Sequence, residues 1–260
     1  MRIILNADDF GYSDDMVEAT IDCFGRGSLT SASIMPKMPA TARAIAFARQ
    51  HEELSFGVHL TFVSDGIEEP VSSPSEIPAL VGPNGQFLPS NRVRLMALFN
   101  RLPADQIERE LTAQLAFLQE QGVRISHVDS HGHLHKFAPF RNALRRVLPR
   151  FNITRVRGVQ DVYLRKPLRS PTYWLGGHWR RRIAASFVTT DHVYLPSSAW
   201  DQGWVEAMPR VLARLAGSSL EIGVHPGHRE PWQHEEYAAI QQLAPALRQQ
   251  GHTLIGWRDL

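Results

Sequence analysis

Acidic and imidazole side chains gather at four places in this 260-residue sequence, each directly after or within a short apolar run. These side chains are Asp8 and Asp9, His59, Asp129 and His131, and His225. In an α/β protein with parallel strands, the carboxyl ends of the strands lie on one face, where ligands bind. Four clusters far apart in the sequence could therefore meet at one point. Carboxylates combined with neutral imidazoles are metal ligands, so the pattern predicts a metal-dependent hydrolase.

The first two clusters are weak signals when each is taken alone. Asp8 and Asp9 lie where the chain leaves a predicted strand, so that one could bind a metal while the other takes a proton from water. However, turns and helix caps also collect aspartates. His59 is bordered by apolar residues, a setting more typical of a core histidine than of a ligand.

The densest cluster is the run from His127 to His135, which holds four histidines and one aspartate and includes a glycine. A metal ion of this kind takes about two or three protein side chains and keeps open positions for water and substrate. The remaining histidines could therefore orient ligands or contact substrate. His225, which turn-forming residues follow at a late strand end, is well placed to act as a general acid.

The elements that would position these residues alternate between strand-like and helix-like patterns. Ser13 is a predicted helix cap, residues 40–49 read as a second helix, and Asp105 with Glu108 forms a capping-box pattern before a third. Strands are predicted near residues 3–5, 30–35, 54–61, 123–128, 153–159, 188–194, 220–224 and 253–257. About eight strands with helices between them are enough for a barrel, which we expect to be one domain over residues 1–260.

Two stretches interrupt this alternation and are expected to be loop insertions, near residues 64–92 and 160–187. The first is rich in proline and directly follows the strand that carries His59, which suggests a lid or binding loop. Within the second, residues 164–182 combine basic and aromatic side chains. Aromatic rings could stack on sugars and arginines could hold anionic groups, but a basic insertion without a ligand is an equally good interpretation.

Composition narrows the choice of partners and compartment. The chain has 28 basic and 26 acidic residues, a balance that gives no reason to expect nucleic acid as a partner. A single cysteine, Cys23, fits a structural thiol in a reducing compartment. Since no apolar run approaches the roughly 18 residues of a membrane span, we expect a soluble, cytoplasmic protein. Trp200 and Trp204 would suit a homodimer contact as well as a substrate groove.

Five blocks, spread in order over nearly the whole chain, resemble the YdjC-like carbohydrate deacetylases, a family that includes chitooligosaccharide deacetylases and deacetylase-like proteins of hopanoid biosynthesis. The blocks are Asn6–Gly11, Leu29–Ser33, Gly57–Leu60, Asp129–His135 and His225–Gly227. The resemblance implies an irregular (β/α) TIM-like barrel, similar to that of the polysaccharide deacetylases. It also implies removal of an acetyl group from an N-acetylated sugar, oligosaccharide or glycolipid.

Carried over residue by residue, the resemblance also implies a site. One divalent metal ion would be held by Asp9, His59 and His131. This ligand set suits magnesium, zinc, manganese and cobalt, and we rank zinc or magnesium first. Asp8 would be the general base and His225 the general acid, and Arg157 resembles an arginine that orients the base. The segment Ser75–Phe87 is similar to the hopanoid-associated branch, whereas Asp129–His131 is similar to the chitooligosaccharide branch. The resemblance therefore does not determine which sugar is the substrate.

Two other classes of function remain as alternatives. A metal-dependent phosphoesterase or amidohydrolase could use a pair such as His131 and His133, although such folds usually carry that pair at the first strand. A non-catalytic sugar-binding protein would bind oligosaccharide without releasing acetate.

Overall fold

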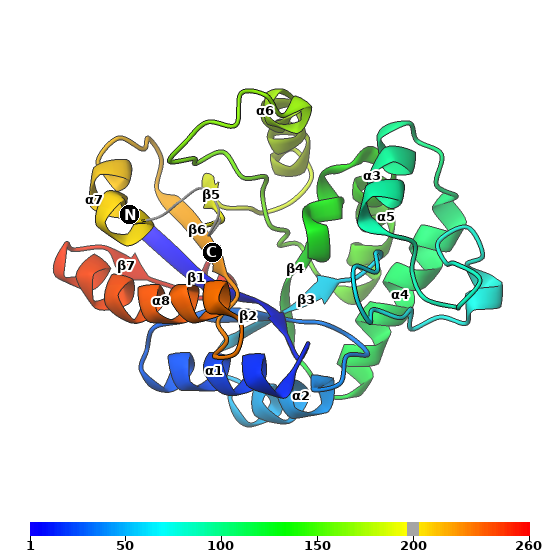
Figure 1. Cartoon of the computed structure of the whole chain (residues 1–260), viewed down its shortest axis with the longest axis horizontal. Coiled ribbons are helices and arrows are strands. Elements are labelled where there is room, and N and C mark those ends of the chain that lie inside the picture. Colours follow the sequence, from blue (N-terminus) through cyan, green and yellow to red (C-terminus); the bar gives the residue numbers. More distant parts are fainter. Residues whose placement is uncertain (197–202) are drawn as a thin grey trace.

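A twisted parallel sheet forms the centre of the protein (Figure 1). The computed structural model describes residues 1–196 and 203–260, apart from the side chains of residues 171 and 172. In this part of the chain, seven strands pair in the order β4-β3-β2-β1-β6-β5, with β7 beside β1. The strands are β1 Arg2–Phe10, β2 Ser31–Ile34, β3 Ser55–Leu60, β4 Ile125–Ser130, β5 His192–Tyr194, β6 Ser219–Val224 and β7 Thr253–Leu254.

The sheet curves into an irregular, partly closed barrel, which confirms the predicted fold class. Between β4 and β5 the ring is completed only by isolated bridges, from Val128 to Val156 and from Arg155 to Val188. The predicted strand 153–159 is therefore wrong as a regular element, and only the end of the predicted strand 188–194 forms β5. A physical reason is that the regular pairing breaks after Arg157, since the carbonyl of Gly158 faces the imidazole of His135, and the chain returns to β5 only where the Asp161 and Val162 amides donate to the Val193 carbonyl.

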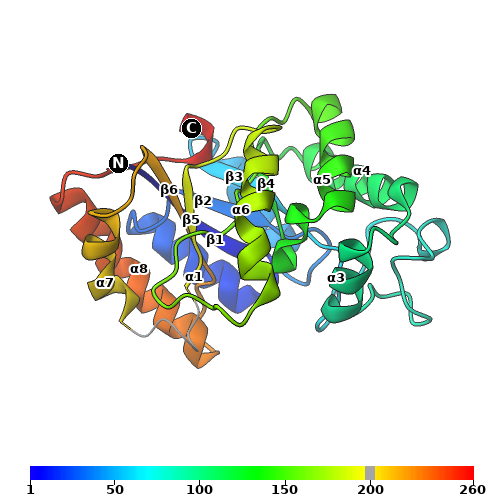
Figure 2. The same cartoon turned by 90° about the horizontal axis from the view of Figure 1, so that it is seen from above.

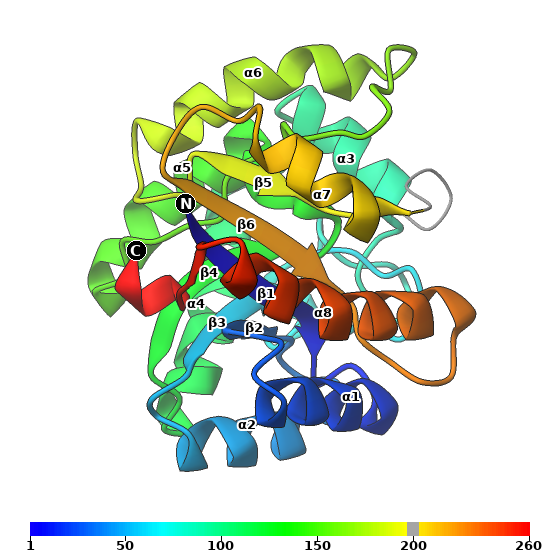
Figure 3. The same ribbon diagram turned by 90° about the vertical axis from the view of Figure 1, so that its left-hand side faces the viewer.

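Helices surround the sheet. Figures 1 and 3 show α1 and α2 on one side of the strands and α6 on the opposite side, and Figure 2 shows α3, α4 and α5 grouped at one end of the molecule. The α-helices are α1 Asp14–Gly25, α2 Thr41–Gln50, α3 Ser90–Leu98, α4 Ala104–Glu120, α5 Ala138–Val147, α6 Pro171–Ala184, α7 Trp204–Leu212 and α8 Pro231–Gln249. The short 3₁₀ helices are η1 Pro74–Glu76, η2 His131–Lys136, η3 Leu148–Phe151 and η4 Trp257–Asp259. None of the helices in the described ranges is both long and apolar enough to cross a membrane.

Two helix starts show where sequence patterns succeed and fail. The Ser13 hydroxyl accepts a hydrogen bond from the Met16 amide at 3.3 Å, as expected for the cap of α1. The capping box predicted at Asp105 is wrong. Pro103 occupies the N-cap position of α4 without a side-chain cap, and Asp105 lies inside the first turn, where a negative charge suits the helix N-terminus.

The first excursion, near residues 64–92, is organised by two buried carboxylates, Glu68 within the excursion and Glu110 on the neighbouring helix α4. Glu68 accepts a hydrogen bond from the Gly66 amide at 2.8 Å. Glu110 of α4 accepts bonds from the Val71 and Ser72 amides, both at 2.9 Å. These bonds satisfy backbone groups that a long loop would otherwise bury without partners. The second excursion contains α6.

Three other expectations concern single side chains. Cys23 is buried, and burial raises its pKa to about 12, which agrees with a structural thiol. A homodimer contact or substrate groove at Trp204 would need an exposed ring, but Trp204 is buried, with its ring centre 5.7 Å from that of Tyr194. Trp200 lies outside the described residues.

Candidate active site

The two adjacent aspartates at the end of β1 serve different parts of one site because the backbone turns between them. Side chains normally alternate between the two faces of a strand. Asp9, however, has a φ of 55°, in the left-handed region that Asp adopts more readily than most residues. The pairing of β1 with β2 also shifts register between Ala7 and Phe10. Asp8 is 1% exposed inside the barrel, whereas Asp9 faces the imidazoles described next.

Asp9, His59 and His131 meet at the carboxyl ends of β1, β3 and β4. One oxygen of Asp9, Oδ1, lies 3.1 Å from His59 Nε2 and 2.9 Å from His131 Nδ1. Ligand atoms of the three residues lie within 4.8 Å of one another. The sequence predicts these three residues as metal ligands, and the structure brings them together.

The surroundings of His59 fit a metal ligand. Its second ring nitrogen, Nδ1, lies 2.8 Å from Asp129 Oδ1, and Ser33 Oγ donates to the other oxygen of Asp129 at 2.9 Å. A carboxylate that accepts the Nδ1 proton leaves the Nε2 lone pair facing Asp9, which is the usual arrangement behind a metal-bound histidine. The donor set of one carboxylate and two imidazoles, with an oriented tautomer, therefore suits a divalent cation.

The electrostatics of this group also favour positive charge beside Asp9. Burial alone would raise the pKa of Asp9, but attraction and hydrogen bonding from His131 and His59 hold it well below its ordinary value. Burial would likewise lower the pKa of His59, yet the Asp129 carboxylate and Asp9 keep it well above the usual range. Asp9 is thus an ionised carboxylate in a place built for a cation.

Asp8 is clamped by Arg157, the arginine predicted to orient it. The guanidinium donates from Nη1 to Asp8 Oδ2 at 2.5 Å and from Nη2 to Asp8 Oδ1 at 2.6 Å. Arg157 Nη1 also lies 2.8 Å from Asp129 Oδ2, and Nε donates to Glu221 Oε1 at 2.9 Å. All four side chains are fully buried. A second group also has metal-ligand geometry and consists of Asp8, His59 and Asp129. Its two carboxylates already face a positive charge, the guanidinium of Arg157.

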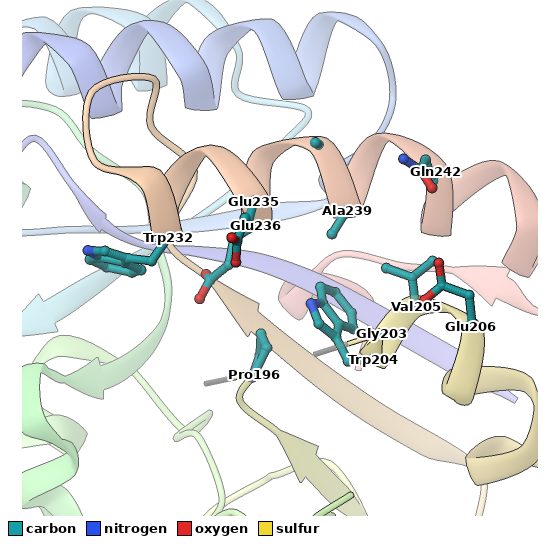
Figure 4. Close-up of a pocket in the computed structure, with 11 residues that line it drawn as sticks. Pro196, Gly203, Trp204, Val205, Glu206, Trp232, Glu235, Glu236, Ala239 and Gln242 are labelled. Carbon is teal, nitrogen blue, oxygen red and sulfur yellow. The ribbon is translucent and has the colours of Figure 1, made fainter. Parts of the chain in front are cut away.

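His225 follows β6, the strand that pairs with β1, and its Nε2 lies 3.9 Å from Asp8 Oδ2. Glu236 of α8 holds it, since Glu236 Oε2 accepts from the His225 amide at 2.6 Å and lies 3.3 Å from Nδ1. Burial lowers the pKa of His225, but Glu236 outweighs this and raises it to about 9. Figure 4 shows Glu236 on the first turns of α8 next to Trp232, whose ring centre is 5.5 Å from that of His225.

The other histidines of the run from His127 to His135 lie outside both candidate metal groups, as far as the described residues show. His127 stacks on Trp257 in the core with 4.9 Å between ring centres, and Gly57 leaves room for it because a Cβ there would come within 2.5 Å of the imidazole. His135 lies 2.7 Å from Ser130 Oγ and 3.2 Å from the Gly158 carbonyl oxygen. These two histidines support the site through packing and hydrogen bonds.

Sequence reasoning missed the roles of Asp129, Glu221 and Glu236. A signal existed for Glu221, because it is a carboxylate inside the apolar run SLEIGV of β6, and a buried charge needs a partner. Asp129 was visible in its cluster, but nothing in the sequence distinguishes a metal ligand from a residue that orients one. Glu236 has no sequence signal, since it is one of several polar residues on α8.

Fold and site together define a barrel protein with a candidate metal centre at the carboxyl ends of its strands. The YdjC-like protein family matches residues 2–252, and the chain belongs to this family. A carbohydrate deacetylase from Brevibacillus brevis is 32% identical over 233 residues, which cover 88% of this chain and 82% of the relative. A carbohydrate deacetylase from Geobacillus stearothermophilus is 34% identical over 65% of this chain and 63% of its own length.

A solved structure from Enterococcus faecalis, provisionally assigned as a cellobiose-phosphate cleavage protein, has the same fold. It superimposes with a TM-score of 0.79 over 99% of this chain and 98% of its own, at 20% sequence identity. At this identity the likeness concerns the architecture alone.

Proposed function

We propose that this protein is a metal-dependent carbohydrate deacetylase that hydrolyses the amide of an N-acetylated sugar or glycoconjugate, releasing acetate and an amine. The observation that carries the proposal is the convergence of His59 Nε2 and His131 Nδ1 on one oxygen of Asp9, with Asp129 orienting His59. The names of the similar curated proteins support the same activity. The ligand set fits a divalent ion, and we propose zinc or magnesium as that cofactor.

Asp9, His59 and His131 would hold the ion. When bound, such an ion polarises the carbonyl of the amide and lowers the pKa of water. Asp8 then accepts a proton from the attacking water, and Arg157 keeps both of its oxygens in place for that transfer.

The water oxygen forms a bond to the carbonyl carbon, and the bond from that carbon to nitrogen breaks. His225 donates its Nε2 proton to the departing amine, and its raised pKa keeps it protonated at neutral pH. Because Asp8 lies on β1 and His225 directly follows β6, and these paired strands come from opposite ends of the sequence, we propose that residues 1–260 act as one domain.

The phosphoesterase and amidohydrolase alternative gains no support from the site, because within the described ranges neither candidate metal group contains His133. The sugar-binding alternative predicts binding without chemistry. An assay of acetate release and phosphate release separates both alternatives from the proposed deacetylase.

The test is an acetate-release screen with untagged protein over N-acetylglucosamine and its oligomers, with an aryl phosphate as the competing substrate. We expect acetate from at least one sugar, loss of this activity with chelator, and recovery when zinc or magnesium is restored. Phosphate release without acetate would support the phosphoesterase. Sugar binding without acetate under every divalent ion would overturn the catalytic proposal.

A further inference from the structure

The segment around α6 concentrates positive charge in a chain that is otherwise nearly balanced. Residues 162–190 hold six of the 28 basic residues of the chain and none of its 26 acidic residues. The rest of the chain therefore carries more acidic than basic side chains. A local excess of positive charge of this kind favours association with an anionic surface. The proposed chemistry makes no use of these basic side chains.

Three large apolar side chains lie exposed in the same segment. Trp174 is 68% exposed, Leu168 is 57% exposed and Leu175 is also exposed. Trp174 Nε1 donates to the Leu168 carbonyl oxygen at 3.0 Å, so the turn before α6 lies against the helix. This bond satisfies the polar end of the indole and leaves most of its apolar ring in water. Figures 1 and 3 show α6 at an outer edge of the molecule, where such side chains can reach a partner.

Five of the six basic residues of the segment have no carboxylate partner among the described residues. They are exposed and comprise Arg165, Lys166, Arg169, Arg181 and Arg182. The first three lie in the turn that also holds Leu168. The last two follow Trp174 and Leu175 by about two helical turns, which places them on the same face of α6. We call these five residues and the three exposed apolar ones the α6 patch.

The opposite face of α6 anchors the helix to the rest of the protein. Trp179 and Ile183 are buried, and the ring centre of Trp179 lies 5.1 Å from that of Phe137. The α6 patch is therefore a folded surface that loses little conformational entropy when a partner binds.

The mixture of apolar and basic side chains distinguishes between possible partners. A second copy of the chain would place an identical patch against this one in a two-fold contact, and the like charges would repel. A soluble polyanion would pair with the basic side chains but would cover neither Leu168 nor Leu175 with apolar groups. An anionic lipid surface suits both kinds of side chain, because its head groups attract arginine and lysine while the acyl boundary accepts tryptophan and leucine.

We propose that the α6 patch docks the protein on an anionic lipid bilayer. The side chains of Trp174, Leu168 and Leu175 enter the boundary between head groups and acyl chains, and the basic side chains contact the phosphates. This inference goes beyond the proposed deacetylation and does not depend on it, because docking requires neither a metal ion nor turnover.

The experiment measures co-sedimentation of the full chain with lipid vesicles. One set of vesicles contains phosphatidylcholine alone, and the other contains equal parts of phosphatidylcholine and phosphatidylglycerol. We expect binding to the anionic vesicles only, and this binding should weaken as salt concentration rises. Each basic residue near an anionic surface contributes about fivefold in affinity, so Arg181→Gln combined with Arg182→Gln should weaken binding by about 10- to 30-fold. Trp174→Ala should weaken it by about tenfold.

Matched controls remove the same groups elsewhere. Arg43→Gln combined with Arg49→Gln removes two exposed charges from α2, on the other side of the sheet, and Phe99→Ala removes an exposed aromatic ring after α3. Both controls should bind as wild type does, and thermal melting of every variant checks that it folds.

Three outcomes would overturn the docking surface. The first is wild-type protein that binds no vesicles or binds both kinds equally. The second is binding that the arginine pair weakens but Trp174→Ala leaves unchanged, which would indicate a site for soluble polyanions. The third is self-association in light scattering that depends on Trp174 and occurs without vesicle binding, which would assign the patch to a second copy of the chain.

Discussion

The site has two sides that are positioned in different ways. The metal side consists of Asp9, His59, His131 and Asp129, and the proton-transfer side consists of Asp8, Arg157 and His225. On the metal side, β3 and β4 are paired neighbours, and their register places His59 directly opposite Asp129. On the proton-transfer side, Arg157 lies outside the regular strands and is fixed by buried ion pairs.

This difference indicates which interactions each side depends on. Strand register orients the metal side through backbone hydrogen bonds that a single side-chain substitution leaves intact. The proton-transfer side depends on buried charges that compensate one another away from water. The loss of one charge therefore changes the hydrogen bonds and the pKa values of the others. Substitutions on the first side should change metal affinity, and substitutions on the second should change turnover and its pH dependence.

The largest expected effects come from the two adjacent aspartates, which belong to different sides. We expect Asp9→Ala to lose both metal and activity, because it removes the oxygen that faces His59 and His131. Asp8→Asn should lower turnover by about 10²- to 10⁴-fold, the usual value of a general base, while metal stays bound. Calorimetric metal titration and acetate release test the pair. Unchanged metal affinity in Asp9→Ala would show that the division of labour is wrong.

A smaller effect is expected from Asp129→Asn, which tests how far the metal side depends on an orienting residue. Asparagine cannot supply the negative charge that holds His59 Nδ1, so we expect metal affinity to fall by about 10- to 100-fold. Metal titration measures this, with Asp105→Asn on the exposed first turn of α4 as the control. Equal affinity in the two variants would mean that strand register alone orients His59.

The same difference explains what the sequence could predict. Asp9, His59 and His131 lie at the ends of apolar strands, so the rule that strand ends share one face predicted that they would meet, and the resemblance to a family marked these three as the metal ligands. The clamp around Arg157 follows no such rule, since the predicted strand 153–159 survives only as isolated bridges. Resemblance to a family identified Arg157. The contact between Arg157 and Glu221, however, depends on side-chain directions inside the barrel. The contact between Glu236 and His225 depends on how α8 packs, which a single sequence does not encode locally.

On the proton-transfer side, Glu236→Gln should shift the alkaline limb of the pH profile. Burial lowers the pKa of His225, but Glu236, followed by Asp9 and Asp8, raises it to about 9, so glutamine at 236 would lower this pKa. Because His225 must be protonated to donate, activity should then be lost at lower pH than in wild type. Rates measured between pH 5 and 10 test this, with the exposed Glu235→Gln as the control. Identical alkaline limbs would exclude His225 as the acid.

The smallest expected change in turnover comes from Glu221→Gln, which separates the charge of Glu221 from its hydrogen bonds. Arg157 and Trp257 Nε1 both donate to Oε1, the latter at 3.1 Å, while Oε2 has no partner among the described residues. Burial raises the pKa of Glu221 from 4.5 to about 7, although Arg157 lowers it. The folded protein thus binds this proton more tightly than the unfolded chain does. Stability should therefore decline as pH rises from 4.5 to about 7.

Glutamine at 221 keeps an acceptor for Arg157 and Trp257 but cannot ionise, so it should remove this decline, which is on the order of 3 kcal/mol. Urea unfolding at several pH values measures the difference between variant and wild type, and Glu120→Gln on the surface of α4 is the control. If Glu221→Gln keeps turnover within about tenfold, hydrogen bonds suffice to hold Arg157 against Asp8. A loss as large as that of Asp8→Asn would instead show that the proton-transfer side requires the charge itself.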